Sequence, residues 1–303
     1  MTHAVYVLTG AGTELANSYL PALRLSATSL RRHIAGVTVS CFCDSAMSRL
    51  VGSLPESKTG LIDRWVECPD ATGGPIHRSR FIKTSLRNRL DGPFVYLDCD
   101  SVVTGPLDRL FGCPQDLGFT VDAFFPQNPG RFPKWLGSHY RRLGWARPHR
   151  YYSGAVFFAA DNARTRQFFE RWHVNWRLSV RAGLVADQPP LNAAFTQLGL
   201  SPELFSEMYN FLVGCEERRL TSEVCIAMLL ASQGPPWLPR YRDLLQRVGR
   251  GEPISSADLD NLFPVGTLLP RQPVSWPSEL RRRLLRWFRL GWARLGWYDA
   301  SQS

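Results

Sequence analysis

Two aspartates one residue apart, Asp98 and Asp100, follow the apolar run FVYL at 94–97. Side chains two residues apart on an extended chain point the same way, so both carboxylates can reach one object. At a separation of about 4 Å they repel by roughly 4 kcal/mol at an effective dielectric of 20. Hard divalent cations take oxygen ligands and often bridge carboxylates to a diphosphate. The pair therefore indicates either a cation site for a phosphorylated substrate or a solvated strand end with two acids in a turn.

Strand-like and helix-like segments alternate around this pair. We expect strands at 4–9, 36–44, 64–68, 94–97, 117–124 and 154–160, and helices at 20–34, 80–90 and 163–178. The alternation predicts an α/β fold with a mainly parallel sheet flanked by helices, whose ligand site lies at the carboxyl ends of the strands. The run at 223–231 fits a buried strand or a helix equally well.

Composition sets limits on the class of protein. The chain has 303 residues, 44% of them hydrophobic, which suits a globular domain. Its net charge of +10 favours an anionic partner, although an arginine-rich coding bias would explain the charge equally well. Seven scattered cysteines without a C-x-x-C pair indicate a reducing compartment. With no signal peptide and no run of about 20 apolar residues, we expect a cytoplasmic protein.

Four segments carry a resemblance to a known family. FVYLDCDSVV resembles the metal-binding D-x-D segment of GT-A glycosyltransferases, especially the retaining enzymes of family 8, where the pattern is close to YLDADTLV. SRFIKTSL, YYSGAVFF and ADQPPLNAAF are similar to further family segments in the same order. The resemblance covers roughly 1–215. It implies a GT-A (Rossmann-like) domain. Because the composition becomes rich in proline and arginine after SQGPPW at 232–237, we place this domain at 1–240 and a small helical basic and aromatic extension at 241–303.

The resemblance also implies an activity and a set of contacts. Such an enzyme transfers a hexose, with retention, from a UDP-sugar donor to a hydroxyl of a glycan or lipid-linked acceptor, using Mn²⁺ or Mg²⁺. Asp98 and Asp100 would hold the metal, Asp187 would bind donor-sugar hydroxyls, and Gln188 would support the anomeric carbon. The residues implied in nucleotide-sugar binding are Thr9, Gly10, Asp44, Lys83, Asp98, Ser153 and Gly154.

Two of these side chains allow a plainer explanation. Lys83 could belong to the polar face of its helix, and Asp187 could cap the short helix expected from Pro189. Asn192, in the same segment, is expected to be structural.

Two departures from the family pattern bear on activity. Family 8 enzymes complete the metal shell with a C-terminal histidine, and Ala231 stands where that histidine is expected. Tyr152 replaces the asparagine that usually precedes the S-G pair. A catalytically weak or inactive nucleotide-sugar-binding homologue that acts at a membrane surface is therefore the alternative.

Two further segments suggest other functions. GAGTEL at 10–15 supplies G-x-G after a strand, but Leu15 replaces the third glycine, so a dinucleotide-dependent oxidoreductase is the weaker hypothesis. The stretch 277–298 predicts a helix with arginines opposite leucine, tryptophan and phenylalanine, which suits peripheral contact with the membrane inner face. Packing on the catalytic domain is the other explanation. Nucleic-acid binding is not expected, because no known module is recognisable.

Overall fold

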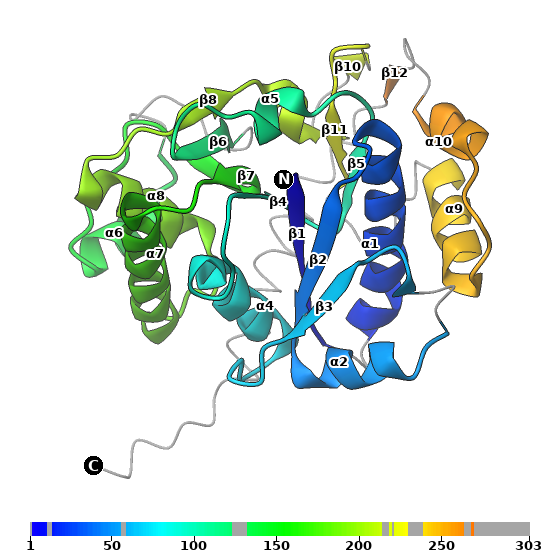
Figure 1. Ribbon diagram of the computed structural model, residues 1–303. Helices are drawn as coiled ribbons and strands as arrows, with labels where there is room; N and C mark the ends of the chain where they lie inside the picture. Colours follow the sequence, from blue (N-terminus) through cyan, green and yellow to red (C-terminus); the bar gives the residue numbers. More distant parts are fainter. Residues whose placement is uncertain are drawn as a thin grey trace.

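A computed structural model describes residues 2–10, 14–55, 59–122, 132–213, 218–219, 221–229, 239–263 and 268–269. Its centre is a seven-stranded sheet in the order β3-β2-β1-β4-β7-β6-β8 (Figure 1). The strands are β1 (His3–Leu8), β2 (Thr38–Cys43), β3 (Arg64–Glu67), β4 (Phe94–Leu97), β6 (Leu117–Val121), β7 (Tyr152–Ala159) and β8 (Glu203–Phe205). Only β7 runs against its neighbours in this sheet. The predicted mainly parallel sheet is confirmed.

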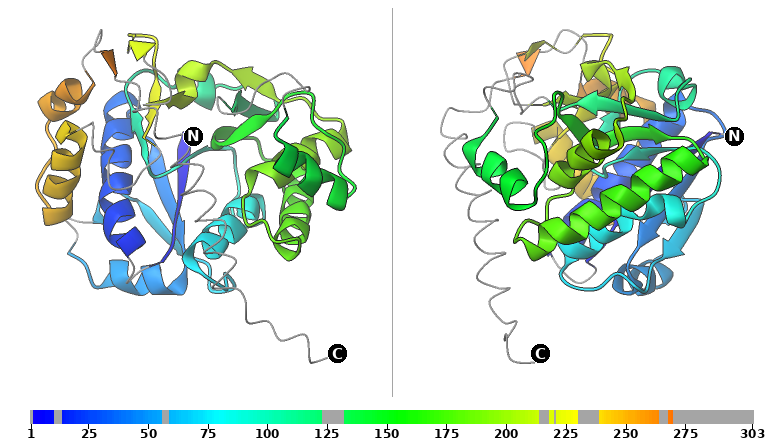
Figure 2. Two further views of the ribbon diagram at one scale, coloured as in Figure 1. Left: turned by 180° about the vertical axis from the view of Figure 1, so that it is seen from behind. Right: turned by 90° about the vertical axis from the view of Figure 1, so that its left-hand side faces the viewer.

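Helices cover both faces of the sheet (Figures 1 and 2). One face carries α1 (Glu14–His33), and the other carries α4 (Pro75–Thr84), α7 (Ala163–Arg181) and α8 (Gln188–Leu198). Successive strand residues point to opposite faces. Tyr6 accordingly packs with the α1 side, whereas Val5 and Val7 pack with the α4 and α7 side.

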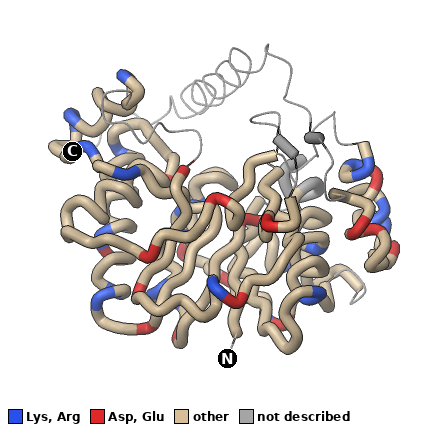
Figure 3. The backbone as a smooth tube through the Cα atoms, turned by 90° about the horizontal axis from the view of Figure 1, so that it is seen from above, with Lys and Arg blue, Asp and Glu red and all other residues tan. Residues whose placement is uncertain are grey.

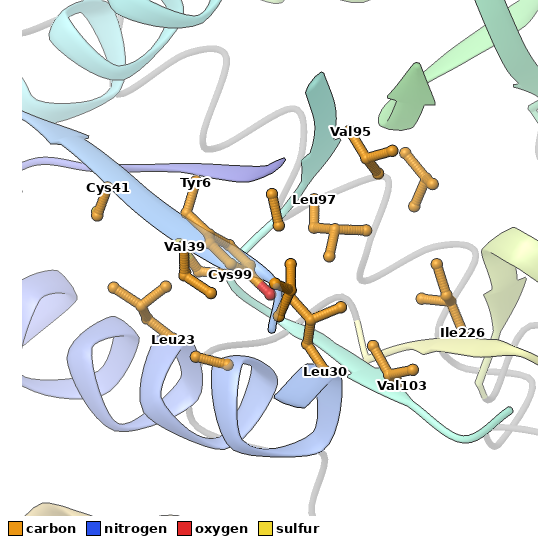
Figure 4. Packing of buried hydrophobic residues seen from close by; sticks show 14 of the residues in the cluster. Tyr6, Leu23, Leu30, Val39, Cys41, Val95, Leu97, Cys99, Val103 and Ile226 are labelled. Carbon is orange, nitrogen blue, oxygen red and sulfur yellow. The ribbon is translucent and has the colours of Figure 1, made fainter. Parts of the chain in front are cut away.

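The two faces bury different kinds of side chain. On the α1 side the core is largely aliphatic, with Leu23 and Leu30 of α1 against Val95 and Leu97 of β4 (Figure 4). On the other side it is rich in aromatic rings, which include Phe94, Phe119, Phe157, Phe168 and Trp172. The six cysteines within the described ranges are free, and all but Cys113 are buried, so they act as small core residues.

A smaller sheet extends the fold beyond the D-x-D segment. It joins β5 (Ser101–Val103), β11 (Ile226–Met228) and β9 (Phe211–Leu212), so the described part of the ambiguous run at 223–231 contains a strand and no helix. The remaining elements are β10 (Arg218–Arg219), β12 (Leu268–Leu269), α2 (Ser45–Gly52), α5 (Asp108–Phe111), α6 (Lys134–Arg142), α9 (Pro239–Arg250), α10 (Ser256–Leu262) and the 3-10 turns η1 (Leu86–Asn88) and η3 (Glu207–Asn210).

Several predicted helix boundaries were wrong. The helix expected at 20–34 begins earlier, at Glu14, and the helix expected at 163–178 extends to Arg181. The helix expected at 80–90 begins at Pro75, which suits a first helical turn, and ends at Thr84. It ends there because the hydroxyls of Thr84 and Ser85 donate to carbonyls one turn back and compete with the helical pattern. The helix expected from Pro189 begins one residue earlier, at Gln188.

The C-terminal part of the described chain packs on the first helix. Leu244 and Leu245 of α9 share a buried cluster with Ala22 and Leu25 of α1. The proposed boundary near residue 240 stays a prediction, and 277–298 lies outside the described residues. Within the described ranges, no helix is both long enough and apolar enough to cross a membrane.

Candidate active site

The carboxyl ends of four parallel strands meet at one edge of the sheet. Thr9 follows β1, Asp44 follows β2, Asp98 follows β4 and Asp122 follows β6. Because β7 is antiparallel, its amino end, with Ser153, lies at the same edge. The topology alone therefore gathers polar side chains at the edge where α/β folds bind ligands.

The D-x-D turn is held by its backbone. The Asp98 N–H donates to the carbonyl of Ala155 in β7 at 3.0 Å, and the Ser101 N–H donates to the Asp98 carbonyl at 3.2 Å. The Leu229 N–H donates to the Asp100 carbonyl at 3.0 Å. Residues 99–100 form a turn rather than strand, and the side chains of Asp98 and Asp100 line one cleft together with Arg80 of α4. Ala231, the position of the expected histidine, lies outside the described residues.

Lys83 of α4 is the buried centre of the site, with only 2% of its surface exposed. Its Nζ lies 3.2 Å from Asp98 Oδ1 and 3.2 Å from Asp187 Oδ2, and sits 4.5 Å from the centroid of the Tyr96 ring. The Tyr96 hydroxyl donates to the same Asp98 Oδ1 at 2.7 Å. The interpretation of Lys83 as a residue of a solvated helix face is therefore wrong.

Asp187 pairs with two cations at once. Its Oδ1 lies 3.2 Å from Arg80 Nε, one helical turn before Lys83 in α4. Burial alone would raise the pKa of this carboxyl, but the charges of Arg80 and Lys83 outweigh burial and hold the pKa below its ordinary value. Asp187 occupies the N-cap position of α8 without making a capping side-chain bond, so the capping explanation is wrong.

The pKa of Asp100 is shifted in the opposite direction from that of Asp187. Burial, reinforced by the negative charge of Asp98, raises the pKa of Asp100 to about 7. The pair thus favours a positive partner between its carboxylates, and two carboxylates are the donor set with which Mg²⁺ or Mn²⁺ joins a substrate phosphate. Within the described ranges no cluster of three or more His, Cys, Asp or Glu could hold a metal alone. The residues fit a cation whose shell is completed by phosphate or water oxygens.

Gln188 lies at the start of α8, away from the lysine. Its Nε2 donates to Oδ2 of Asp122, a carboxylate that is 7% exposed. The nearby Asn192 accepts from the Tyr152 N–H at 2.7 Å and donates to the Tyr152 and Gln188 carbonyls at 3.0 and 2.9 Å. Asn192 therefore ties β7 to α8 and is structural, as expected.

Gly154 of β7 lies directly against the buried ion pair. A Cβ at this position would lie 3.6 Å from both Lys83 Nζ and Asp187 Oδ2. The preceding Ser153 is buried, and its Oγ accepts from the Ala155 N–H at 3.2 Å. The S-G pair thus forms the β7 wall beside the lysine.

Asp44 has structural partners for both carboxylate oxygens. It accepts from the Gly10 N–H at 3.1 Å and, as the N-cap of α2, from the Met47 N–H at 2.8 Å. Arg78 Nε lies 2.6 Å from it. The Thr9 hydroxyl donates to the carbonyl of Pro75 at 2.7 Å, which fixes the β1 end against α4. Contacts of these residues with a nucleotide stay predictions.

A cleft opens between the β1 end, the first turns of α4 and the D-x-D turn. It is lined by Val7, Leu8, Thr9, Tyr19, Pro75, Ile76, Ser79, Arg80, Tyr96, Asp98, Cys99 and Asp100. Three predicted residues, Thr9, Asp98 and Asp100, share this lining. Lys83 adjoins the cleft through Asp98 and Asp187 adjoins it through Arg80, whereas Gln188 contacts Asp122.

Sequence reasoning missed three residues of this site. Arg80 is three residues before Lys83, so helical spacing placed both on one side of α4. Tyr96 precedes Asp98 by two residues, the same spacing that joins Asp98 to Asp100. Asp122 lies inside the strand predicted at 117–124, whereas β6 ends at Val121, and its partner Gln188 lies 66 residues away in sequence, so no local pattern indicated the contact.

Comparison with known proteins identifies the fold. No protein-family model and no curated protein matches this sequence. The galactosyltransferase LgtC with donor and acceptor sugar analogs superposes with a TM-score of 0.54 at 15% identity, over 92% of this chain and 100% of that one. An active-site glutamine-to-glutamate mutant of LgtC superposes with a TM-score of 0.55 at 16% identity, with the same coverage of both chains. Mouse xyloside xylosyltransferase 1, apo form, superposes with a TM-score of 0.51 at 12% identity, over 78% of this chain and 99% of that one. The chain therefore has the GT-A type of fold found in these glycosyltransferases.

Proposed function

We propose that this protein is a glycosyltransferase that transfers a hexose from a UDP-sugar to a hydroxyl of a glycan or lipid-linked acceptor. The observation that carries the proposal is the buried Lys83, which links the D-x-D carboxylate Asp98 to Asp187 beside an open cleft. A metal and a diphosphate bound at Asp98 would then lie close to Asp187, a carboxylate that can accept hydrogen bonds from sugar hydroxyls. The fold shared with solved glycosyltransferases supports the proposal.

The donor diphosphate would lie against the D-x-D turn. Asp98 and Asp100 would hold Mn²⁺ or Mg²⁺, which neutralises the negative charge of the departing diphosphate. Arg80 lines the cleft with 29% of its side chain exposed, so its guanidinium can meet a phosphate while it still pairs with Asp187. Lys83, with two ion pairs already, holds the carboxylates in place.

The sugar would lie between Asp187 and Gln188. Asp187 stays ionised through its two cations and can accept hydrogen bonds from sugar hydroxyls. Since Nε2 of Gln188 donates to Asp122, the amide Oε1 is the atom that would face the cation-like sugar. An acceptor hydroxyl attacking on the face from which UDP leaves gives retention, and preorganised charges carry most of the rate. One of the structurally similar proteins is an active-site glutamine-to-glutamate mutant of LgtC. This supports an assay of the corresponding change Gln188→Glu in this protein.

A donor screen by thermal shift tests this proposal. The melting temperature of the full chain is measured with each of a panel of UDP-sugars, with and without Mn²⁺. We expect one donor to raise it in the presence of Mn²⁺, because a ligand that binds only the folded state stabilises it. If no UDP-sugar in the panel shifts the melting temperature, with or without Mn²⁺, the proposed function is wrong.

We also propose a cytoplasmic location, with the protein held peripherally on the inner face of the membrane. The sequence of 277–298, a basic and aromatic stretch, supports this. Acceptors that are lipid-linked would then be presented where the enzyme resides.

A further inference from the structure

The surface around α6 is basic and has few acids near it. No Asp or Glu occurs in the sequence between Asp122 and Asp161. Exposed basic side chains come from α6, from the loop that follows it and from the last turns of α7. We call this the α6–α7 basic surface, and its members are Lys134, Arg141, Arg142, Arg147, Arg150, Arg177 and Arg181.

Contacts between the two helices bring these cations together. Nε2 of His139 in α6 lies 2.9 Å from the hydroxyl of Ser179 in α7, and Arg142 Nη1 donates to the carbonyl of Ala182 at 3.2 Å. The right-hand view of Figure 2 shows α6 beside one end of α7. Seen from above, basic positions gather at the upper left (Figure 3). One continuous region of the molecule therefore carries the positive charge.

These cations lack counter-charges. In the part of the chain that the structure describes, no carboxylate lies within 4.0 Å of the charged nitrogens of the α6–α7 basic surface. Other basic residues differ: Arg31, Arg89 and Arg166 each have an aspartate oxygen within 2.7 Å. On α9 and α10, at the right of Figure 3, basic and acidic residues lie next to one another, as in the ion pair of Arg247 with Asp258. A surface that is left uncompensated favours an anionic partner.

Large apolar side chains are exposed among the cations. Trp135 of α6 is 52% exposed, and Val174 and Leu178 of α7 are 48% and 39% exposed. On α6, Trp135 and Arg142 share one helical stripe, as do Leu178 and Arg181 on α7. Guanidinium groups beside an indole and aliphatic side chains suit the headgroup layer of a bilayer, where the cations meet phosphates and the apolar groups enter the interface. Acidic glycans or nucleic acid would use the charges but leave the aliphatic side chains in water.

We propose that the α6–α7 basic surface docks the protein on an anionic lipid bilayer. The inference uses none of the residues assigned to the candidate active site and does not depend on 277–298. It holds or fails independently of the proposed transferase activity.

Vesicle co-sedimentation with the full chain tests it. Binding is compared on phosphatidylcholine vesicles and on vesicles that also contain phosphatidylglycerol, at about 0.1 M and about 1 M salt. The test variant carries Lys134→Gln, Arg141→Gln and Arg181→Gln. The matched control also loses three charges, through Arg49→Gln, Arg64→Gln and Arg242→Gln, at exposed positions on other elements.

Each basic side chain near an anionic surface strengthens partitioning about fivefold, so the test variant should bind on the order of 100-fold more weakly. The control should bind like wild type, and high salt should weaken wild-type binding. Equal losses in both variants would mean that net charge alone acts, and unchanged binding of the test variant would place the contact elsewhere. Binding to heparin without binding to anionic vesicles would indicate a polyanion partner. Each of these three results overturns the proposal.

Discussion

Replacing Lys83 by methionine probes the ion-pair centre of the site. The side chain keeps most of its volume but loses the charge that faces Asp98 and Asp187. Each 3.2 Å contact corresponds to about 5 kcal/mol at an effective dielectric of 20, and the desolvation of a buried lysine offsets much of this. Removing one partner of a buried pair typically costs 3–5 kcal/mol. Asp98 is partly exposed, and Asp187 keeps its ion pair with Arg80, so neither carboxylate is left buried without a partner. We therefore expect a loss at the low end of this range, about 3 kcal/mol in the free energy of unfolding.

The assay is urea denaturation followed by circular dichroism, with the exposed Lys134→Met as control. The control should change the free energy of unfolding by less than about 0.5 kcal/mol. The deficit of Lys83→Met should shrink in acid. The pKa of Asp187 is depressed in the folded state, so its stabilisation is present above the unfolded pKa and is lost as pH falls through the folded pKa. Equal unfolding free energies for the two variants at all pH values would refute the ion-pair reasoning.

Three further predictions concern the supporting residues. Tyr96→Phe removes the donor to Asp98 and should cost about 1 kcal/mol of stability and weaken metal-dependent donor binding, measured by titration calorimetry. Asn192→Leu leaves backbone groups of Tyr152 unpaired in the core and should cost about 3 kcal/mol in urea denaturation. Burial and nearby arginines lower the pKa of His173 to about 4, so its stabilisation is complete above pH 6.5 and is lost on acidification toward pH 4. Wild type should therefore lose about 1–2 kcal/mol more than His173→Gln between pH 7 and pH 4, after allowance for partial exposure.

Local sequence predicted the strands and the edge at which the site lies. The apolar runs at 4–9 and 94–97 predicted buried strands, and their alternation with helices predicted a mainly parallel sheet with its ligand edge at Asp98. The spacing of Asp98 and Asp100 predicted that both reach one site, and both line the same cleft, although a turn rather than a strand places them there. These features depend on residues that are close together in the sequence, so one sequence is enough to infer them.

Long-range partners could not be predicted in the same way. Asp187 carries a sequence signal typical of a helix cap, yet two cations from α4 draw its carboxylate away from that role. Asp122 and Gln188 meet only because β6 and α8 are brought together by the sheet order. The early start of α4 at Pro75 likewise reflects packing near the β1 end, where Thr9 bonds to the Pro75 carbonyl.

The most direct test of the proposed function is UDP release from the donor identified by thermal shift. Wild type, Asp98→Asn, Asp100→Asn and the control Asp91→Asn, whose side chain is 98% exposed, are assayed with Mn²⁺ and with EDTA. We predict metal-dependent UDP release by wild type and the control, and a loss of at least about 100-fold in both D-x-D variants. Release that persists in EDTA or in the D-x-D variants would contradict the roles given to Asp98 and Asp100, and no release by wild type from any donor would contradict the function itself.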